Sequence, residues 1–259
     1  MCTLLLAWHA HPALALVVAA NRDEEYARPT EPARFWADVP ELLAGRDLVA
    51  GGTWLGVTRA GRFAAITNVR EPGVPAPAGV RSRGELVAGF LRGTMTPEAY
   101  LAGVTPGRYA GFNLVVGDRQ SLWYLTNRQA GPQRLAPGIH GVANAAMDTP
   151  WPKVARGKER LAELVAGGTV APADLLGMLH DRTVAPDEAL PDTGIGLLGE
   201  RLLSPLFVES PIYGTCSSTA LVVTQAGQVA FSERTTNPEA PTFGAEVAAQ
   251  FVVPRTPAG

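Results

Sequence analysis

Residues 2–24 read CTLLLAWHAHPALALVVAANRDE and combine two apolar runs with a polar end. The runs at 3–8 and 13–19 have the length of buried strands, and the four residues between them can form a turn. The pattern predicts a hairpin. Because the second strand of a hairpin runs antiparallel to the first, its polar end, residues 21–24, is expected to lie near Cys2.

Turn-forming residues separate three further pairs of short apolar runs, and each pair predicts another hairpin. The pairs are 54–58 with 63–68, 112–116 with 122–126, and 219–224 with 229–233, and a run at 247–253 resembles one more strand. Capping residues or prolines, followed by apolar residues at helical spacing, indicate helices between the hairpins. They predict helices near 82–91, from residue 96 onward, over 153–165, and from about residue 172 to 179. Residues 180–218 show no regular pattern of helix or strand.

Strands that come in adjacent pairs favour antiparallel sheets over a parallel sheet, in which single strands alternate with helices. The order of elements therefore predicts an α+β protein of two antiparallel sheets packed together, with helices outside. No internal repeat or linker divides the 259 residues, so one domain is expected over 1–259, with a tail at 254–259.

The composition excludes several classes of protein. A hydrophobic fraction of 46% and a net charge of −2 exclude a disordered chain, and 22 basic against 24 acidic residues argue against nucleic-acid binding. No apolar run reaches the ~18 residues of a membrane helix, and the first basic residue, Arg22, comes too late for a signal peptide. Two cysteines, Cys2 and Cys216, cannot form a disulfide framework, so a reducing, cytoplasmic location is expected.

Cys2 is the residue with the clearest chemistry. A methionine before a small residue is commonly removed after synthesis, and removal of Met1 exposes a thiol and a free α-amine on one residue. The α-amine has a pKa of about 7.7–8.0, so at neutral pH it can act as the base that activates its own thiol. The alternative is that Cys2 is an incidental small residue at a frayed end.

The polar end of the second run offers neighbours for that thiol. Arg22 can lower the thiol pKa, Asp23 can hold the amine or orient the arginine, and Asn21 can supply amide donors. Alternatively, residues 21–24 form a polar surface loop with an ion pair that contributes little.

Two asparagines are candidates for an oxyanion hole, because a carboxamide NH2 can donate to a developing negative oxygen. Asn68 ends a predicted strand and Asn144 follows an apolar stretch, although asparagines at such places often bond their own backbone. Arg234 closes the last predicted hairpin and can anchor an anionic substrate group, unless it is simply solvated. We therefore predict catalytic roles for Cys2, Arg22, Asp23, Asn68 and Asn144, and substrate contacts for Asn21, Trp54 and Arg234.

The sequence offers no metal or phosphate motif. The four histidines, at positions 9, 11, 140 and 180, lack the spacing of a zinc site. The glycine-rich segment 51–56 lacks the spacing of a dinucleotide or phosphate loop. Neither a metal nor a cofactor is expected on this ground.

A set of motifs in a fixed order is more specific than any single signal. The motifs are Met1-Cys2, 20–24 (ANRDE), 51–56 (GGTWLG), 67–68 (TN), 111–114 (GFNL), Asn144 with 149–151 (TPW), and 232–234 (SER). In this order they resemble the NRDE family, the transport-and-Golgi-organisation proteins, from residue 1 to about residue 252. The resemblance implies a four-layer αββα sandwich of the N-terminal-nucleophile type. In some members it implies links to haem mobilisation and to acyl-coenzyme A or lipid metabolism.

A more distant likeness is to choloylglycine hydrolases and penicillin V acylases. By this likeness Cys2 is the nucleophile, with Arg22 and Asp23 as its neighbours. The likeness further implies that Asn68 and Asn144 are oxyanion or orienting amides, and that Arg234 matches a late arginine of those enzymes.

Three functions remain open on the sequence. The first is a cysteine hydrolase acting on a small acylated amide or thioester. The second is a carrier that binds haem or an acyl-coenzyme A in the same pocket without turnover, and the third is an interaction module with a degenerate site. The expected partner is a small molecule, while the sequence leaves the oligomeric state open.

Overall fold

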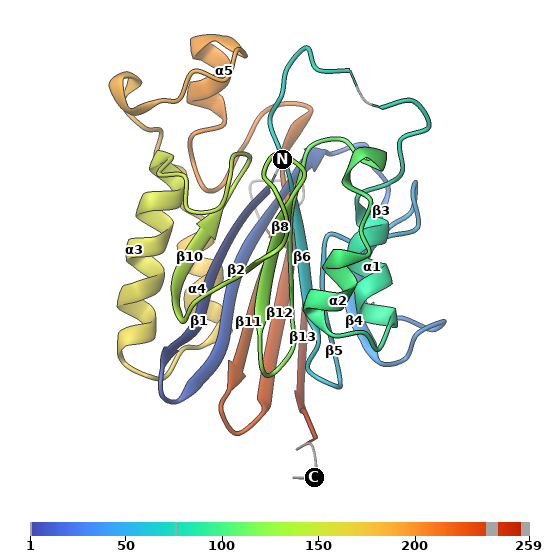
Figure 1. Cartoon of the computed structure of the whole chain (residues 1–259). Helices are drawn as coiled ribbons and strands as arrows, with labels where there is room; N and C mark the ends of the chain where they lie inside the picture. The colour runs from blue at the N-terminus through green and yellow to red at the C-terminus, as the bar shows by residue number, and fades with distance from the viewer. Residues whose placement is uncertain (1, 76, 237–242, 255–259) are drawn as a thin grey trace.

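Two antiparallel sheets lie face to face in the computed structural model, which describes residues 2–75, 77–236 and 243–254 (Figure 1). The first sheet has the order β10-β1-β2-β11-β12-β13. Its strands are β1 (Cys2–His11), β2 (Leu14–Glu25), β10 (Gly138–Val142), β11 (Tyr213–Thr224), β12 (Gln228–Thr236) and β13 (Phe243–Val252).

The second sheet runs in sequence order from β3 to β9. Its strands are β3 (Thr30–Phe35), β4 (Leu42–Asp47), β5 (Leu55–Thr58), β6 (Phe63–Asn68), β7 (Phe112–Gly117), β8 (Leu122–Thr126) and β9 (Gln133–Arg134). Each strand pairs antiparallel with its neighbours, as the adjacent hairpins of the sequence predict.

Helices cover the outer face of each sheet. Helices α3 (Pro152–Ala166) and α4 (Pro172–Leu179) pack on the first sheet, and α1 (Gly84–Arg92) and α2 (Pro97–Ala102) pack on the second (Figure 1). Short elements complete the structure: η1 (Pro106–Arg108), η2 (Asp187–Ala189) and α5 (Gly196–Leu202). The four-layer αββα sandwich expected from the sequence is confirmed.

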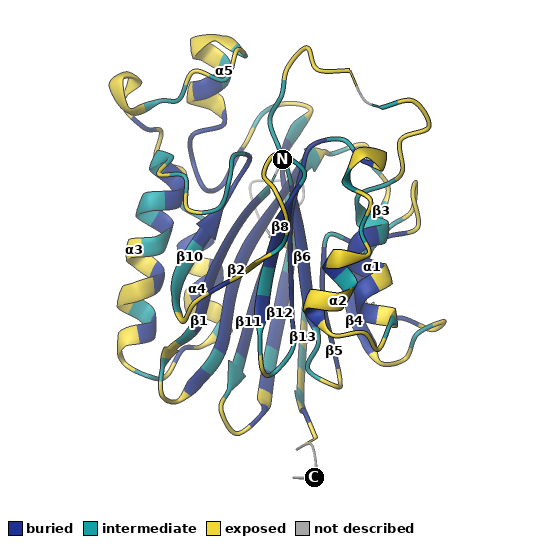
Figure 2. Cartoon of the chain, in the orientation of Figure 1, coloured by how far each residue is buried: buried dark blue, intermediate teal, exposed yellow. Residues whose placement is uncertain are grey.

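Alternation along the strands divides the core into layers, because successive side chains of a strand point to opposite faces. Leu4 and Val18 belong to the cluster between the two sheets, whereas Leu5 and Val17 pack beneath α3 and α4. Figure 2 shows the strands buried along most of their length, while the outer faces of the helices are exposed. The alternation of β1 and β2 decides which of their polar side chains face the space between the sheets.

The N-terminal hairpin differs from the prediction in its turn. β1 continues to His11 and β2 begins at Leu14, so His9 lies in the strand rather than in the turn. The strand register shifts between Trp8 and His11, and His9 takes a φ of 43° at this bulge. The polar residues 21–24 are likewise part of β2, which ends at Glu25, instead of following the strand.

The sequence patterns did not predict every helix and strand. β3, β4, β9 and β10 were not predicted, and α5 and the start of β11 lie in the stretch 180–218. β3 reads TEPARF and β10 reads GIHGV, and each lies at the edge of its sheet, where apolar alternation is weak. Of the predicted tail, residues 255–259 lie outside the described residues.

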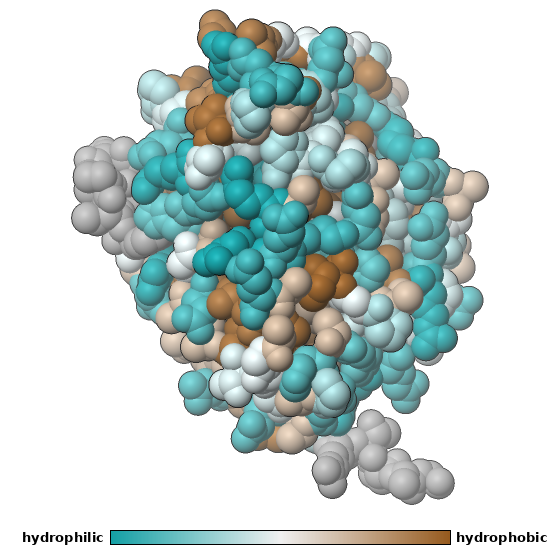
Figure 3. Space-filling view, turned by 90° about the vertical axis from the view of Figure 1, so that its left-hand side faces the viewer, coloured by the Kyte–Doolittle hydropathy of each residue, from teal (hydrophilic) through white to brown (hydrophobic). Residues whose placement is uncertain are grey.

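The face that carries α3 and α5 has a mixed polar and apolar surface. Figure 3 shows hydrophobic side chains at the upper end of this face and in further patches across its middle. Leu197, Leu198 and Leu202 of α5 are among the exposed large hydrophobic residues. Within the described ranges, no helix combines the length and apolar character needed to cross a membrane.

Candidate active site between the sheets

Cys2 and Arg22 are direct partners in the ladder of β1 and β2. Paired residues project to the same face, and here that face is the one of Leu4 and Ala20, between the two sheets. Asn21 and Asp23 belong to the opposite set, which faces the helical layer of α3 and α4. The hairpin therefore brings the predicted cluster to Cys2, as the sequence indicates, but divides it between two faces of the sheet.

A cavity of about 410 Å³ opens at the position of Cys2. Its lining includes five of the predicted site residues, Cys2, Arg22, Asp23, Trp54 and Asn68. Three arginines that were not predicted, Arg28, Arg81 and Arg83, also line it, together with the acidic side chains of Glu24 and Asp47. Charged side chains of both signs therefore line the cavity, and guanidinium groups are the most numerous of them.

Arg22 forms one wall of the cavity beside the predicted aromatic residue. Its guanidinium lies 4.5 Å from the ring centroid of Trp54 and 3.9 Å from the Glu24 carboxylate. A guanidinium over an indole face gains a cation–π attraction that is stronger when water is excluded, and Arg22 is only 6% exposed. Trp54 therefore fixes the position of the arginine that pairs with Cys2.

The surroundings of the Cys2 thiol disfavour its ionised form. Burial raises its pKa, and the Asp23 carboxylate raises it further, while the charge of Arg22 and a hydrogen bond from the Asp23 backbone lower it. Because burial is the largest influence, the thiol needs a base before it can act as a nucleophile.

Asp23 is a buried carboxylate held by β11. Its Oδ1 accepts a hydrogen bond of 2.7 Å from Thr215 Oγ1, and Tyr213 Oη donates to its backbone oxygen at 2.9 Å. Burial raises the pKa of Asp23, and the charge of Lys153 is the strongest influence in the opposite direction. The ionised form of Asp23 thus depends on cations around it.

Lys153 is a functional candidate that the sequence reasoning missed. It lies in the first turn of α3, is 2% exposed, and its Nζ has no hydrogen-bond partner among the residues that the structure describes. Burial lowers the pKa of Lys153, while the charges of Asp23 and Cys2 raise it. The helix gives a signal, because positions 153, 157 and 161 share its buried face and a lysine stands at the first of them.

A buried ion pair connects the segment after β6 with α5. Arg70 Nη1 donates to Glu200 Oε2 at 2.7 Å, and both side chains are shielded from solvent. The Arg70 guanidinium also lies 4.9 Å from the ring centroid of Trp151, which precedes α3. Through these contacts the otherwise irregular residues near α5 are attached to the site.

Asn144 supports Asn68 and does not line the cavity. Asn144 Nδ2 donates to the backbone oxygen of Asn68 at 2.9 Å, and Asn144 O accepts from the Arg70 backbone at 2.8 Å. Its Oδ1 is buried, with no hydrogen-bond partner in the described part of the chain. Of the two predicted asparagines, Asn68 lines the cavity and Asn144 holds its backbone in place.

Asn21 and Arg234, for which substrate contacts were predicted, do not line the 410 Å³ cavity. Asn21 Nδ2 donates to the backbone oxygens of Leu179 and Leu206, both at 2.9 Å, and Ser218 Oγ donates to Asn21 Oδ1 at 2.6 Å. Arg234 Nε donates to Glu246 Oε2 of β13 at 2.6 Å. Neither residue lines the large cavity. Asn21 binds β2 to its neighbours, and Arg234 ties β12 to β13.

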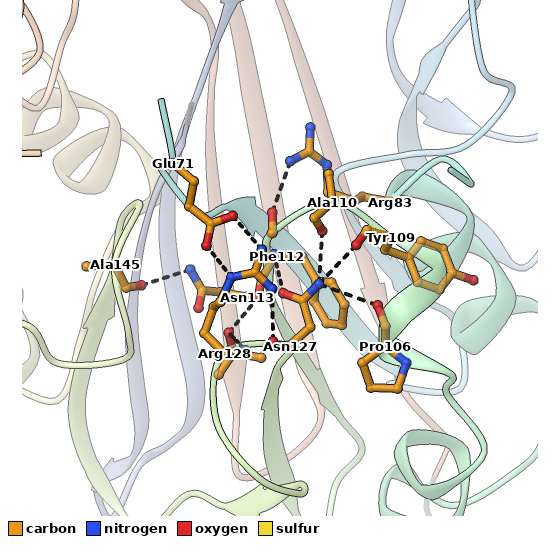
Figure 4. A network of polar contacts seen from close by, with 12 residues as sticks. Glu71, Arg83, Pro106, Tyr109, Ala110, Phe112, Asn113, Asn127, Arg128 and Ala145 are labelled. Atoms are coloured by element: carbon orange, nitrogen blue, oxygen red, sulfur yellow. Dashed lines mark hydrogen bonds and ion pairs between the residues drawn. The ribbon is translucent and has the colours of Figure 1, made fainter. Parts of the chain in front are cut away.

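The loop before β7 holds the far wall of the cavity. Asn127 Nδ2 donates to the backbone oxygens of Pro106, Tyr109 and Ala110, and Ala110 lines the cavity (Figure 4). Arg83, which lies beside this network in Figure 4, donates from Nη1 to the backbone oxygen of Gly111 at 3.0 Å. Residues 111–114, singled out in the sequence, do not line the cavity, and Gly111 contributes the acceptor for Arg83.

Comparison with known proteins identifies relatives and structural neighbours. The family model described as "Transport and Golgi organisation 2" matches residues 1–238. The "Transport and Golgi organization protein 2 homolog" of Bos taurus is 38% identical over 257 residues, covering 90% of this chain and 92% of the relative. The corresponding homolog of Homo sapiens is 36% identical with the same coverage.

Two solved structures share the fold at low sequence identity. The Caenorhabditis elegans N-acylethanolamine-hydrolyzing acid amidase ortholog has a TM-score of 0.51 at 12% identity, covering 85% of this chain and 92% of that one. The C2A mutant of conjugated bile acid hydrolase from Clostridium perfringens has a TM-score of 0.53 at 9% identity, covering 96% and 92%. At such identities the likeness establishes the fold, which is that of the N-terminal-nucleophile hydrolases.

Proposed function

This chain belongs to the Transport and Golgi organisation 2 family, and on that basis we propose that it is a cysteine N-terminal-nucleophile hydrolase acting on small acylated amides or thioesters. One observation carries the proposal: Cys2 lines a polar cavity opposite Arg22, with the buried Asp23 next along β2. The names of both structural neighbours describe hydrolases, and one of them is a variant changed at a cysteine in position 2.

The reaction begins with proton transfer from the thiol. Once Met1 is removed, the Cys2 α-amine takes the proton from Sγ, and the Asp23 carboxylate holds the resulting ammonium group. The charge of Arg22 and the Asp23 backbone hydrogen bond favour the thiolate against the effect of burial. Sγ then attacks the acyl carbonyl carbon, and the carbonyl oxygen becomes negative.

The asparagines and the amine complete the turnover. Asn68 lines the cavity and stabilises the oxyanion, while Asn144 holds the Asn68 backbone through its bond of 2.9 Å. Collapse of the intermediate breaks the bond to the leaving amine or thiol, which takes the proton from the α-ammonium group. Water, activated by the same amine, then cleaves the acyl–sulfur bond, releases the carboxylic acid and restores the thiol.

A mass measurement and a substrate panel test the proposal. Intact-mass analysis of the protein from cells is expected to show loss of Met1, and brief exposure to an acyl amide or acyl thioester to trap an acyl group on Cys2. The Cys2→Ser variant should lose the adduct and the turnover, whereas Cys216→Ser should keep both, because Cys216 does not line this cavity. Retention of Met1 together with no adduct on any member of the panel would overturn the proposal.

The second candidate function is a carrier that binds haem or an acyl-coenzyme A, and the arginine-rich wall of the cavity favours a ligand that is anionic. Of the described residues that line the cavity, none is a histidine, so the cavity offers no imidazole to haem iron. An acyl-coenzyme A is therefore the better fit of the two. Binding of a non-hydrolysable acyl-coenzyme A analogue, with no acyl transfer from the thioester, would identify the carrier.

A free, unmodified Cys2 fits a reducing compartment, so we propose that the protein is located in the cytoplasm.

A further inference from the structure

Arg83 is a cation on the cavity wall without an acidic partner. It is half-buried immediately before α1, and its side chain donates a hydrogen bond to a neutral acceptor, the backbone oxygen of Gly111, at 3.0 Å. Among the described residues, no carboxylate lies within ion-pair distance of its guanidinium. Burial lowers the pKa of Arg83 and the charge of Cys2 opposes this, as expected for a guanidinium near the thiol.

The other arginines of the cavity are already engaged. Arg28 Nη2 lies 2.8 Å from Asp47 Oδ2, and Arg81 Nε lies 2.6 Å from Glu85 Oε1. Arg22 is placed between the Trp54 ring and Glu24. Of the four arginines that line the cavity, Arg83 is therefore the one without a carboxylate of the described residues at ion-pair distance, and Glu24 acts on its charge only from farther away.

The position of Arg83 is fixed by backbone packing on both sides. Thr53 N donates to Gly84 O at 3.3 Å, and a Cβ on Gly52 would lie 2.5 Å from the Gly84 carbonyl carbon, so the two segments are in direct contact. The Gly111 acceptor directly follows Ala110, a residue of the cavity wall to whose backbone Asn127 donates (Figure 4). A guanidinium held in place loses little freedom on binding, and its remaining N–H groups fit a carboxylate or phosphate bidentately.

We propose that Arg83 binds an anionic group, a carboxylate or a phosphate, of the molecule that reacts with or is held beside Cys2. The start of α1 adds to the attraction, because the N-terminal end of a helix favours negative charge. That the bound molecule is a substrate rests on the proposed function, but the anion site itself does not require turnover. The anion site narrows the candidate substrates to acyl amides or thioesters that carry a negative charge.

Two alkylating reagents of similar size and different charge test this site without knowledge of the substrate. In each reaction the Cys2 thiolate displaces iodide, from either anionic iodoacetate or neutral iodoacetamide. The reactivity of the thiolate contributes equally to both rates. The ratio of the iodoacetate rate to the iodoacetamide rate therefore measures how strongly an anion is attracted to the thiol. Cys216→Ser serves as the background, so that Cys2 is the reacting cysteine.

The Arg83→Gln variant is expected to lower the ratio of iodoacetate to iodoacetamide rates by on the order of tenfold, as loss of a focused local charge predicts. Arg83→Lys should retain part of the ratio. Arg81→Gln is the matched control, because Arg81 lines the same cavity but is exposed and paired with Glu85, and it should leave the ratio within about twofold. A ratio in Arg83→Gln equal to that of the control would overturn the site.

Protection experiments separate the two kinds of anion. Inorganic phosphate or acetate is added during alkylation by iodoacetamide, and the one that slows the reaction through Arg83 identifies the preferred group. Protection that persists undiminished in Arg83→Gln would contradict the proposal. If the rate ratio depends on Arg83 and the acyl panel nevertheless gives neither adduct nor turnover, the hydrolase is wrong and the anion site stands.

Discussion

Cys2 faces Arg22 directly across the antiparallel ladder of β1 and β2, and the guanidinium of Arg22 rests on the ring of Trp54. The thiol therefore has a charge of opposite sign to its ionised form at a fixed place. Burial raises the pKa of Cys2, and Arg22 is one of the groups that lower it.

Replacing Arg22 is expected to make Cys2 a weaker acid. In Arg22→Gln the thiol loses the favourable charge, so its pKa should rise. The pH profile of iodoacetamide alkylation in the Cys216→Ser background measures the shift. Arg28→Gln is the control, because Arg28 lines the cavity but is paired with Asp47. An unchanged profile in Arg22→Gln would show that Arg22 does not act on the thiol.

Lys153 and Asp23 are expected to be coupled in stability. Lys153→Met leaves the buried Asp23 without its strongest opposing charge, and a buried charge left without compensation costs about 3 kcal/mol or more. In the Asp23→Asn background the same substitution should cost less than about 1 kcal/mol, because no buried negative charge remains. Urea unfolding of the four proteins at pH 7 gives the coupling free energy. Additive effects would exclude the charge compensation.

Asn144 is expected to affect turnover more than stability, if the chain is a hydrolase. Asn144→Ala removes the donor that holds the Asn68 backbone. Loss of oxyanion support costs about 2.7–4 kcal/mol in transition-state stabilisation, a decrease in kcat of roughly a hundredfold or more. The loss of one hydrogen bond should change the free energy of unfolding by only about 1 kcal/mol. Steady-state kinetics beside thermal unfolding checks this, and full turnover in Asn144→Ala would remove Asn144 from the mechanism.

His140 is expected to make the free energy of unfolding depend on pH above 6.5. Its ring bonds to Asp148 at 2.9 Å, and this hydrogen bond raises the pKa of His140 above the usual 6.5. A raised pKa in the folded state stabilises the protein below pH 6.5 and loses that contribution as the pH rises through the folded value. The free energy of unfolding should therefore fall as the pH rises above 6.5.

The acid side of the same contact has the opposite sign. His140, Lys158 and the Gly141 backbone bond to Asp148 and outweigh its burial, so that its pKa is lowered to about 2 from 3.8. That contribution is present above pH 3.8 and is lost as the pH falls toward 2. Urea unfolding of His140→Gln against pH checks both limbs. The decrease above pH 6.5 should be absent in the variant, and its persistence would assign it to another group.

The strongly apolar hairpins were predictable because their pattern is local. Residues 3–8, 63–68 and 122–126 alternate or stay apolar between turn residues, and each lies in a strand of the structure. β3 and β10 were not predictable in this way. Each has a partner strand on one side only, so its sequence carries prolines, glycines and charges in place of a buried pattern.

For the site, the sequence by itself determined that a thiol, a guanidinium and a carboxylate meet at the end of a hairpin, since strand length and a short turn bring Cys2 and Arg22 together. Only the tertiary structure decided which face each side chain takes and what else arrives there. The side chain of Asn21 bonds to α4 and β11. Lys153 of α3 interacts electrostatically with Asp23 and Cys2, and Arg83, just before α1, lines the cavity, although both are distant from the hairpin in sequence. The reason is physical: a ladder register depends on residues close in the chain, whereas the packing of layers depends on surfaces that meet only in the folded protein.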